Sequence, residues 1–243
     1  MLIRAFGLEQ SRLISLCGAG GKTTLMFALA REFIAAGARV LVTTTTKIAR
    51  DEADGWSSFN AASMERVLRT ARRLLPERGP QRAGALIAYS AVSVDGRRLI
   101  GFTPGLVDEL AQSGRFDRIL VEADGSARKP LKAPAAHEPV IPASTHALII
   151  VAGINGLGLP LREDNLFRAD IWSQLSGLAL GASVTAESLA CNASIPTVSH
   201  AAARTMRKEY CSSIRPTQLS ASPKRCRSRH SSKRRLPTRW DAR

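Results

Sequence analysis

The chain has 243 residues, and 44% of them are hydrophobic, which is ordinary for a protein with a globular core. The formal net charge is +15, but residues 204–243 hold thirteen Lys and Arg against two Asp and Glu, a net of +11, which leaves +4 for residues 1–203. This distribution argues against a nucleic-acid-binding surface spread over the whole chain.

The cysteines and the apolar runs bear on the cellular setting. The four cysteines form no Cys-x-x-Cys pair and no spacing typical of a zinc site or a disulfide framework. The first residues lack the basic start and apolar stretch of a signal peptide, and the longest apolar run, residues 147–152, is too short to cross a bilayer. We therefore expect a soluble, cytoplasmic protein that is not bound to a membrane.

Five short segments are expected to be buried strands. Each is rich in Val, Ile or Leu and is followed by polar or glycine-containing residues. They are Leu13–Leu16, Arg39–Thr44, Ala85–Tyr89, Arg118–Val121 and Ala147–Val151.

Three segments with apolar residues at helical spacing are expected to be helices. Thr23–Ala36, with Gly37 as its C-cap, joins the first two strands in a βαβ unit, and Met64–Leu75 and Pro104–Gln112 follow. Strands that alternate with helices predict an α/β fold of three layers, in which helices cover both faces of a mainly parallel sheet. Because it holds several prolines, segment 128–142 is expected to be an ordered loop.

Residues 204–243 differ from the rest, because they consist largely of Ser, Pro and Arg without apolar periodicity. Such a composition cannot bury a core. Three interpretations remain open: a disordered basic tail, a loss of the reading frame near Cys191, and a tail that binds RNA or DNA. Nucleic-acid binding is the least favoured, since Tyr210 and Trp240 are the only aromatic residues there that can stack on bases.

A glycine loop, Gly18-Ala19-Gly20-Gly21-Lys22-Thr23-Thr24, lies between the first strand and the first helix. Glycines let backbone N–H groups turn toward phosphates at the N-terminus of a helix. Lys22 can reach the β- and γ-phosphate oxygens, and the Thr23 hydroxyl can bind Mg²⁺. Leu16 stands where the full P-loop pattern has its first glycine, so the loop matches the shorter form seen in the Mur peptide ligases. The sequence predicts a site for ATP or GTP with Mg²⁺; the alternative is a chance glycine turn.

Two carboxylates, Glu122 and Asp124, follow the apolar residues of the strand that begins at Arg118. The carboxyl ends of parallel strands face the ligand crevice of an α/β sheet, where carboxylates can hold Mg²⁺ directly or through water, as in a Walker B site. The two side chains point the same way if the strand continues to Asp124. One of them can also orient a water molecule or accept a proton. An ordinary acidic turn at Gly125 is the alternative.

Further polar residues come to the same edge of the sheet. Thr45 and Lys47 end the second strand and can help to hold the nucleotide, although β-branched threonines also simply suit a strand. Arg128 and Lys132 precede His137 in the proline-rich loop, which can bind an anionic substrate, close over phosphates or lie solvated. A lone histidine without partners is more often structural than catalytic.

Four motifs in order, residues 17–24, 42–48, 121–126 and 131–139, resemble the YqeC family. The sequence Gly-Ile-Asn-Gly-Leu-Gly that begins at Gly153 and the pair Phe167-Arg168 extend the resemblance, which covers about Leu13–Leu189. It implies a P-loop NTPase-like fold and an accessory role for selenium-dependent hydroxylases. After Cys191 the chain departs from the family, since it lacks the Asn-Lys-x-Asp-like segment that bears on guanine recognition. The choice between ATP and GTP therefore stays open.

We accordingly divide the chain into a nucleotide-binding α/β domain, residues 1–203, and a basic irregular tail, residues 204–243. Whether the domain is complete at its C-terminal end is left open at this point. The residues assigned to catalysis are Lys22, Glu122 and Asp124; to the nucleotide Gly18, Ala19, Gly20, Gly21, Lys22, Thr23, Thr24, Thr45 and Lys47; to the metal Thr23, Glu122 and Asp124; and to substrate or partner Arg128, Lys132, His137 and Arg168.

The leading functional hypothesis is an NTP-binding and NTP-hydrolysing accessory protein in the maturation of molybdenum- and selenium-dependent hydroxylases. Its expected partner is such a hydroxylase or its cofactor, and a homodimer is also considered. The alternatives are an ATP-dependent ligase or kinase that acts on a small acid, which the short glycine loop favours, and nucleic-acid binding through the basic tail.

Overall fold

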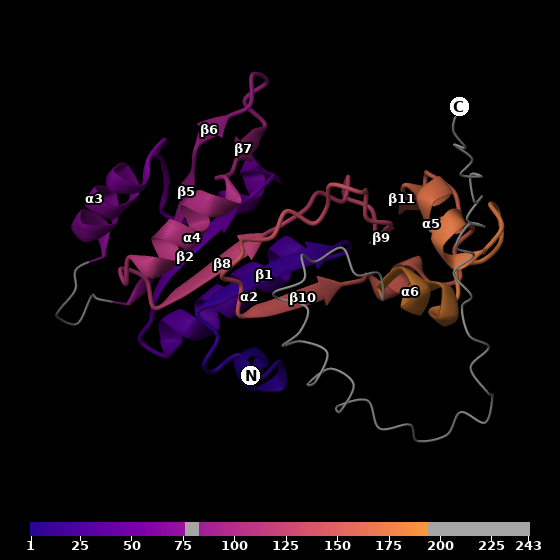
Figure 1. Ribbon diagram of the computed structural model, residues 1–243, viewed down its shortest axis with the longest axis horizontal. Helices are drawn as coiled ribbons and strands as arrows, with labels where there is room; N and C mark the ends of the chain where they lie inside the picture. The colour runs from indigo at the N-terminus through magenta and orange to yellow at the C-terminus, as the bar shows by residue number, and fades with distance from the viewer. Residues whose placement is uncertain (76–82, 194–243) are drawn as a thin grey trace, which may run out of the picture.

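The computed structural model describes residues 1–75 and 83–193, so that the predicted tail lies outside the described residues (Figure 1). Its centre is a six-stranded, wholly parallel sheet with the order β10-β1-β8-β2-β5-β4. The α/β class and the parallel sheet are thus confirmed. The strands are β1 (Leu13–Gly18), β2 (Arg39–Thr44), β4 (Ser58–Asn60), β5 (Gly84–Tyr89), β8 (Arg118–Glu122) and β10 (Ala147–Val151).

Helices cover both faces of this sheet, as the strand and helix pattern predicts. The helices of this part are α1 (Leu2–Ala5), α2 (Lys22–Ala35), α3 (Met64–Leu74) and α4 (Pro104–Gln112). Local signals fix two of the starts: the side chain of Ser63 accepts a hydrogen bond from the backbone of α3, and Thr103 does the same for α4, in which Pro104 takes the first position.

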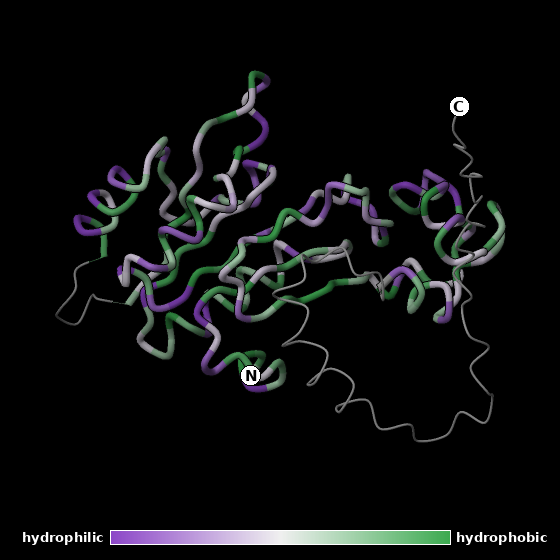
Figure 2. Tube along the Cα trace, viewed as in Figure 1, coloured by the Kyte–Doolittle hydropathy of each residue, from purple (hydrophilic) through white to green (hydrophobic). Residues whose placement is uncertain are grey.

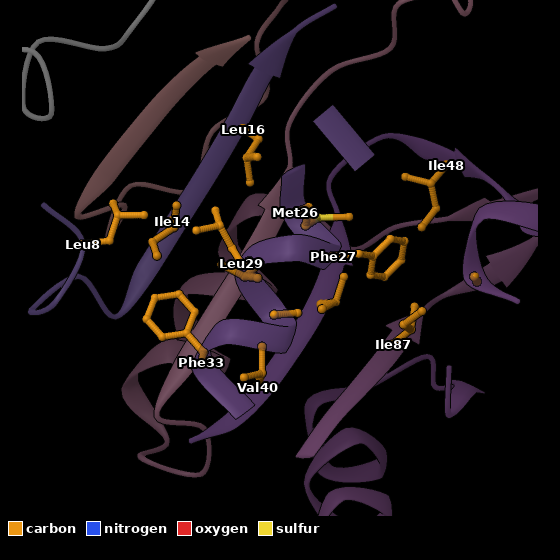
Figure 3. Close-up of a cluster of buried hydrophobic side chains, with 14 of the residues drawn as sticks. Leu8, Ile14, Leu16, Met26, Phe27, Leu29, Phe33, Val40, Ile48 and Ile87 are labelled. Carbon is orange, nitrogen blue, oxygen red and sulfur yellow. The ribbon is translucent and has the colours of Figure 1, made fainter. Parts of the chain in front are cut away.

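The strands alternate between two buried hydrophobic clusters. Ile14 and Leu16 of β1 pack with Met26 and Leu29 of α2 in the first cluster (Figure 3), whereas Leu13 belongs to the second, with residues of α3 and α4. Side chains of a strand alternate between its faces, so a strand buried on both sides is apolar throughout. Figure 2 shows this as mostly hydrophobic colouring along β1, β8 and β10.

A small antiparallel sheet stands beside the parallel one. It has the order β3-β7-β6, formed by β3 (Lys47–Ala49), β7 (Arg98–Ile100) and β6 (Ala91–Val92), and the short 3-10 helix η1 (Arg50–Ala53) follows β3. The sequence predicted neither this sheet nor β4, because strands of two or three residues are too short to show a hydrophobic periodicity.

A C-terminal module, residues 154–193, lies at the opposite end of the molecule from α3 (Figure 1). It contains η2 (Ile154–Gly156), β11 (Leu166–Phe167), α5 (Ala169–Ser176) and α6 (Ala186–Ala193), and β11 pairs with β9 (Leu131–Lys132). Leu131 and Ala133 pack in its own core, around Trp172. Segment 128–142 is otherwise without helix, as its prolines predict, and β9 is its one regular element.

Within these described residues, no helix is both long and apolar enough to cross a membrane.

Candidate functional site

The glycine loop forms the sharp connection from β1 to α2. Gly18, Gly20 and Gly21 have φ angles of +96°, +77° and +126°, in the left-handed region that favours glycine. A Cβ atom on Gly20 would lie 2.5 Å from the carbonyl oxygen of Pro130, and one on Gly18 would overlap the carbonyl of Val151. Glycine is required at these two positions by backbone conformation and by close backbone contacts together.

Lys22 begins α2 and turns back toward the loop. Its Nζ donates a hydrogen bond of 2.7 Å to the carbonyl oxygen of Gly18 and lies 3.2 Å from Oδ1 of Asp124 and 3.6 Å from Oε1 of Glu122. The residue is only 3% exposed. The structure therefore brings Lys22 together with both predicted carboxylates.

Thr23 and Glu122 form the second contact between α2 and β8. Oγ1 of Thr23 donates a hydrogen bond of 2.8 Å to Oε2 of Glu122. Burial raises the pKa of Glu122, although the Lys22 ammonium and the Thr23 hydrogen bond oppose that rise. A buried carboxylate with an adjacent hydroxyl is an oxygen-rich arrangement next to the glycine loop.

Asp124 has a different environment from Glu122. Strand β8 ends at Glu122, so the strand alternation does not continue to Asp124. Asp124 is 1% exposed, and its carboxylate accepts hydrogen bonds from the Gly18 N–H, at 2.9 Å and 3.2 Å, and from Nζ of Lys132, at 2.9 Å. It fixes the start of the glycine loop to the segment that carries Lys132.

These contacts continue into the C-terminal module as a chain of ion pairs. Nζ of Lys132 also lies 2.6 Å from Oε2 of Glu138, which in turn pairs with Nη1 of Arg168 at 2.6 Å. Arg168, at the start of α5, additionally donates a hydrogen bond to the carbonyl of Ala133. We call this set the buried ion network; its members are Lys22, Glu122, Asp124, Lys132, Glu138 and Arg168.

The buried ion network contains three cations and three anions, so it is formally neutral. Burial alone would raise the pKa of Glu138, but the hydrogen bonds from Arg168 and Lys132 outweigh it and lower that pKa to about 2. The hydrogen bond to Glu138 likewise raises the pKa of Arg168. Lys132 and Arg168 thus have their charges compensated inside the protein and do not face the cleft described next.

A cleft of about 270 Å³ opens beside the glycine loop. Four segments line it: the loop and the start of α2, the β3 strand with η1, the β7 strand, and the residues that follow β8. The lining residues are Gly20, Gly21, Lys22, Thr23, Thr24, Lys47, Ile48, Ala49, Glu52, Arg98, Glu122, Gly125, Ser126, Ala127, Arg128 and Lys129.

Eight of the fifteen residues assigned from the sequence line the cleft, and Asp124, Lys132 and Arg168 are among the seven that do not. Lys47 and Arg128 line it, whereas Thr45 does not, and its hydroxyl donates a hydrogen bond of 2.5 Å to the carbonyl oxygen of Val140. His137 is exposed and outside the lining. Gly18 and Ala19 are also outside the lining, and the N–H of Ala19 donates a hydrogen bond to the carbonyl oxygen of Val151.

Three charged lining residues and one member of the network are not among the residues assigned from the sequence. Arg98, Glu52 and Lys129 line the cleft. Glu138 joins the two cations that the sequence had assigned to substrate or partner. Glu138 stands within the motif of residues 131–139, which was a usable signal. No local signal in the sequence marked Arg98. It lies in a strand of three residues, 50 residues beyond Ile48 in the strand with which it pairs.

Comparison with known proteins places the chain in a family. A model of the family described as YqeC protein matches residues 14–170. The uncharacterized protein YqeC of Escherichia coli (strain K12) is 35% identical over 170 residues, which are 70% of this chain and 62% of that relative. The chain thus spans less than two thirds of the relative's length. No solved structure matches. The family match includes the glycine loop and the whole buried ion network, and the chain belongs to the YqeC family.

Proposed function

We propose that the chain binds a nucleoside triphosphate, ATP or GTP, with Mg²⁺ at the glycine loop. The observation that carries the proposal is the arrangement of Lys22, Thr23 and Glu122 around one end of the cleft, with Thr23 Oγ1 and Glu122 Oε2 2.8 Å apart. Backbone N–H groups at a helix N-terminus favour bound phosphate, and the positive φ angles of Gly20 and Gly21 suit such a loop.

The residues present fit Mg²⁺. This ion prefers oxygen ligands and keeps several waters, so one or two protein oxygens together with phosphate oxygens suffice. The Thr23 hydroxyl and the Glu122 carboxylate supply them. Within the described part of the chain, no group of three or more His, Cys, Asp or Glu offers an all-protein metal site.

Hydrolysis of the nucleotide follows from the same residues. When bound, Mg²⁺ neutralises charge on the phosphate oxygens. Lys22 exchanges its bond to the Gly18 carbonyl for the transferring phosphate, which stabilises the charge that develops there. Glu122, which lines the cleft, orients the attacking water. Asp124 keeps its contacts to Gly18 and Lys132 and holds the loop in position.

We further propose that this nucleotide cycle serves the maturation of molybdenum- and selenium-dependent hydroxylases, as the YqeC resemblance implies. The C-terminal module supports a role with a second molecule, because the buried ion network joins it to the glycine loop. A ligase or kinase that acts on a small acid is the second candidate, and the basic residues that line the cleft favour it.

The test is thermal unfolding with and without Mg²⁺ and either nucleotide. A ligand that binds only the folded state raises its stability, by about 2.7 kcal/mol at one hundred times Kd. We expect ATP or GTP to raise the Tm of the natural chain but not that of Lys22→Ala. If neither nucleotide raises the Tm and the two proteins behave alike, the proposal is wrong. Turnover that depends on a protein partner would favour the maturation role, and turnover that depends on a small acid would favour the ligase or kinase.

A further inference from the structure

One wall of the cleft is built on the small antiparallel sheet and not on the glycine loop. In the pairing of β3 with β7, Ile48 stands opposite Leu99 and Ala49 opposite Arg98. Ile48 and Leu99 are each 2% exposed and belong to the hydrophobic cluster under the sheet, where Figure 3 shows Ile48 on the side of Phe27.

The alternation of strand side chains fixes what the other face carries. Residues next to a buried pair point to the opposite face, so Lys47 and Arg98 share the face turned away from the hydrophobic cluster. Both line the cleft. The small sheet is thus an apolar base that holds two cations over the cleft.

A third cation reaches the same wall from the turn after β8. Ala127 and Arg128 have φ angles of +49° and +59°, which is unusual for two successive residues that are not glycine. Each such residue costs on the order of 1 kcal/mol, and strained positions of this kind cluster at functional sites. The turn places Arg128 beside η1, where its Nη2 lies 3.2 Å from Oδ2 of Asp51.

The ion pair between Arg128, which lines the cleft, and Asp51 is a weak one. Both side chains are exposed, at 72% and 67%, so the pair contributes little to stability and an anion can displace it. Within residues 1–75 and 83–193, the side chains of Lys47 and Arg98 make no hydrogen bond or ion pair. This contrasts with Lys132 and Arg168, whose charges are compensated in the buried ion network.

The charges of the lining residues also favour an anionic ligand at this wall. Five cations line the cleft, Lys22, Lys47, Arg98, Arg128 and Lys129, against the two anions Glu52 and Glu122. Lys22 is already paired with Glu122 and Asp124 at the glycine loop. Arg128 is paired with Asp51, and Glu52 belongs to η1 beside β3, so the lining cations without a hydrogen-bond or ion-pair partner among the described residues are Lys47 and Arg98 of the small sheet. Neither is among the groups that the proposed function assigns to phosphate and Mg²⁺.

We propose that Lys47, Arg98 and Arg128 form an oxyanion subsite for a second substrate, a small molecule that bears a carboxylate or a phosphate group. The inference rests on the proposed function, since it makes the cleft a site for two ligands: the nucleotide on the glycine loop and the anionic molecule facing it. Arg98 is its specificity-determining residue, because a guanidinium offers paired N–H donors that match the oxygens of both groups.

The test is calorimetric titration of two probes, pyrophosphate and citrate, into the full chain saturated with Mg²⁺ and ADP. Because both probes bind Mg²⁺, the probe and protein solutions are brought to the same free Mg²⁺ concentration, and the heat of the same titration without protein is subtracted. ADP fills the glycine loop as far as its β-phosphate and leaves the γ-phosphate position beside Lys22 open, so a probe is assigned to the subsite only where its binding depends on Arg98. The two probes distinguish phosphate from carboxylate as the preferred group. The variant is Arg98→Gln, and the matched control is Arg97→Gln, which removes the same charge from the same hairpin outside the cleft lining.

We expect at least one probe to bind, Arg98→Gln to weaken it about tenfold, and Arg97→Gln to change it less than about twofold. The affinity for Mg²⁺-ADP should be the same in all three proteins. If neither probe binds, the second subsite is wrong. If Arg98→Gln weakens Mg²⁺-ADP as much as it weakens the probe, the subsite is also wrong and Arg98 belongs to the nucleotide site.

A citrate titration without nucleotide separates this inference from the proposed function. If the natural chain binds no Mg²⁺-nucleotide but binds citrate in a manner that depends on Arg98, the proposed function fails and the subsite stands. If Mg²⁺-ADP binds and neither probe does, the proposed function stands and the subsite fails. Far-UV circular dichroism of each variant checks that the exposed substitution leaves the fold intact.

Discussion

Thr23 and Glu122 are joined by a hydrogen bond of 2.8 Å from Oγ1 to Oε2, which connects the first turn of α2 to the end of β8. The same two oxygens are the proposed protein ligands of Mg²⁺. Thr23→Val removes the hydroxyl and keeps the shape, so it should weaken Mg²⁺-nucleotide binding about tenfold, the loss of one contact to a charged group. Thr23→Ser restores the hydroxyl and should bind nearly as well as the natural chain.

This prediction is checked by equilibrium dialysis of labelled nucleotide at several Mg²⁺ concentrations. Thr23→Val should need more Mg²⁺ to reach half saturation, whereas nucleotide binding without Mg²⁺ should be alike in all three proteins. Equal Mg²⁺ dependence in Thr23→Val and Thr23→Ser would show that the hydroxyl does not take part.

Substitution of Lys132 tests how much the buried ion network contributes to the free energy of unfolding. The residue is 7% exposed, and Lys132→Met leaves Asp124 and Glu138 as buried carboxylates without their shared cation. Loss of one partner from a buried pair should lower the free energy of unfolding by about 3 kcal/mol. Lys129→Met is the control, because Lys129 makes one exposed hydrogen bond, to Asp164, and its loss should cost under about 0.5 kcal/mol.

Urea unfolding of both variants gives this comparison. A loss for Lys132→Met no greater than that for Lys129→Met would mean that the network adds nothing to stability.

The lowered pKa of Glu138 predicts that the free energy of unfolding depends on pH. Its pKa falls from 4.5 to about 2 in the folded protein, because the hydrogen bonds from Arg168 and Lys132 outweigh the effect of burial. A depressed pKa means that the folded state holds the proton less tightly than the unfolded state. The stabilisation is therefore complete above pH 4.5 and is lost as the pH falls from 4.5 toward 2.

Glu138→Gln cannot ionise, so its stability should fall less steeply over this range than that of the natural chain. Urea unfolding at pH 5, 4 and 3 measures the two slopes. Parallel slopes would contradict the assignment of Glu138 to the network.

Cys17 should be inert in the folded protein. The residue is buried at the end of β1, and burial, helped by the charge of Asp124, raises the pKa of its thiol to about 12. The thiolate is the reactive form, so iodoacetamide at pH 8 should label Cys17 after unfolding in urea and hardly at all before it. Peptide mass spectrometry reads out the labelling at this one position, and rapid labelling of the folded chain would contradict its burial.

Much of the parallel sheet could be predicted from sequence, because its strands are short apolar runs that end at polar or glycine residues. The limits of β2 and β10 agree with the expected Arg39–Thr44 and Ala147–Val151, and α4 agrees with Pro104–Gln112, where a proline marks the start. The strand β4 was missed, since three residues with one apolar side chain carry no periodic signal.

The site shows the same division. The glycine loop and Glu122 could be placed, because a motif and a strand end fix them locally. The sequence could not predict that Glu122 lines the cleft whereas Asp124 is buried. This difference depends on where β8 ends and on the contact with Lys132 from β9. Arg98 meets Lys47 only through a long-range strand pairing, which no local pattern in the sequence reports.

The central claim is that the glycine loop holds a nucleoside triphosphate with Mg²⁺. Isothermal titration of ATP and of GTP into the natural chain, in Mg²⁺ and again in EDTA, tests it most directly, with Lys22→Ala titrated beside it. The account predicts saturable binding of at least one nucleotide in Mg²⁺, weaker binding in EDTA, and a loss of about tenfold or more in Lys22→Ala, which lacks the cation at the phosphates. Absence of binding in the natural chain, or equal affinity in Lys22→Ala, would contradict it.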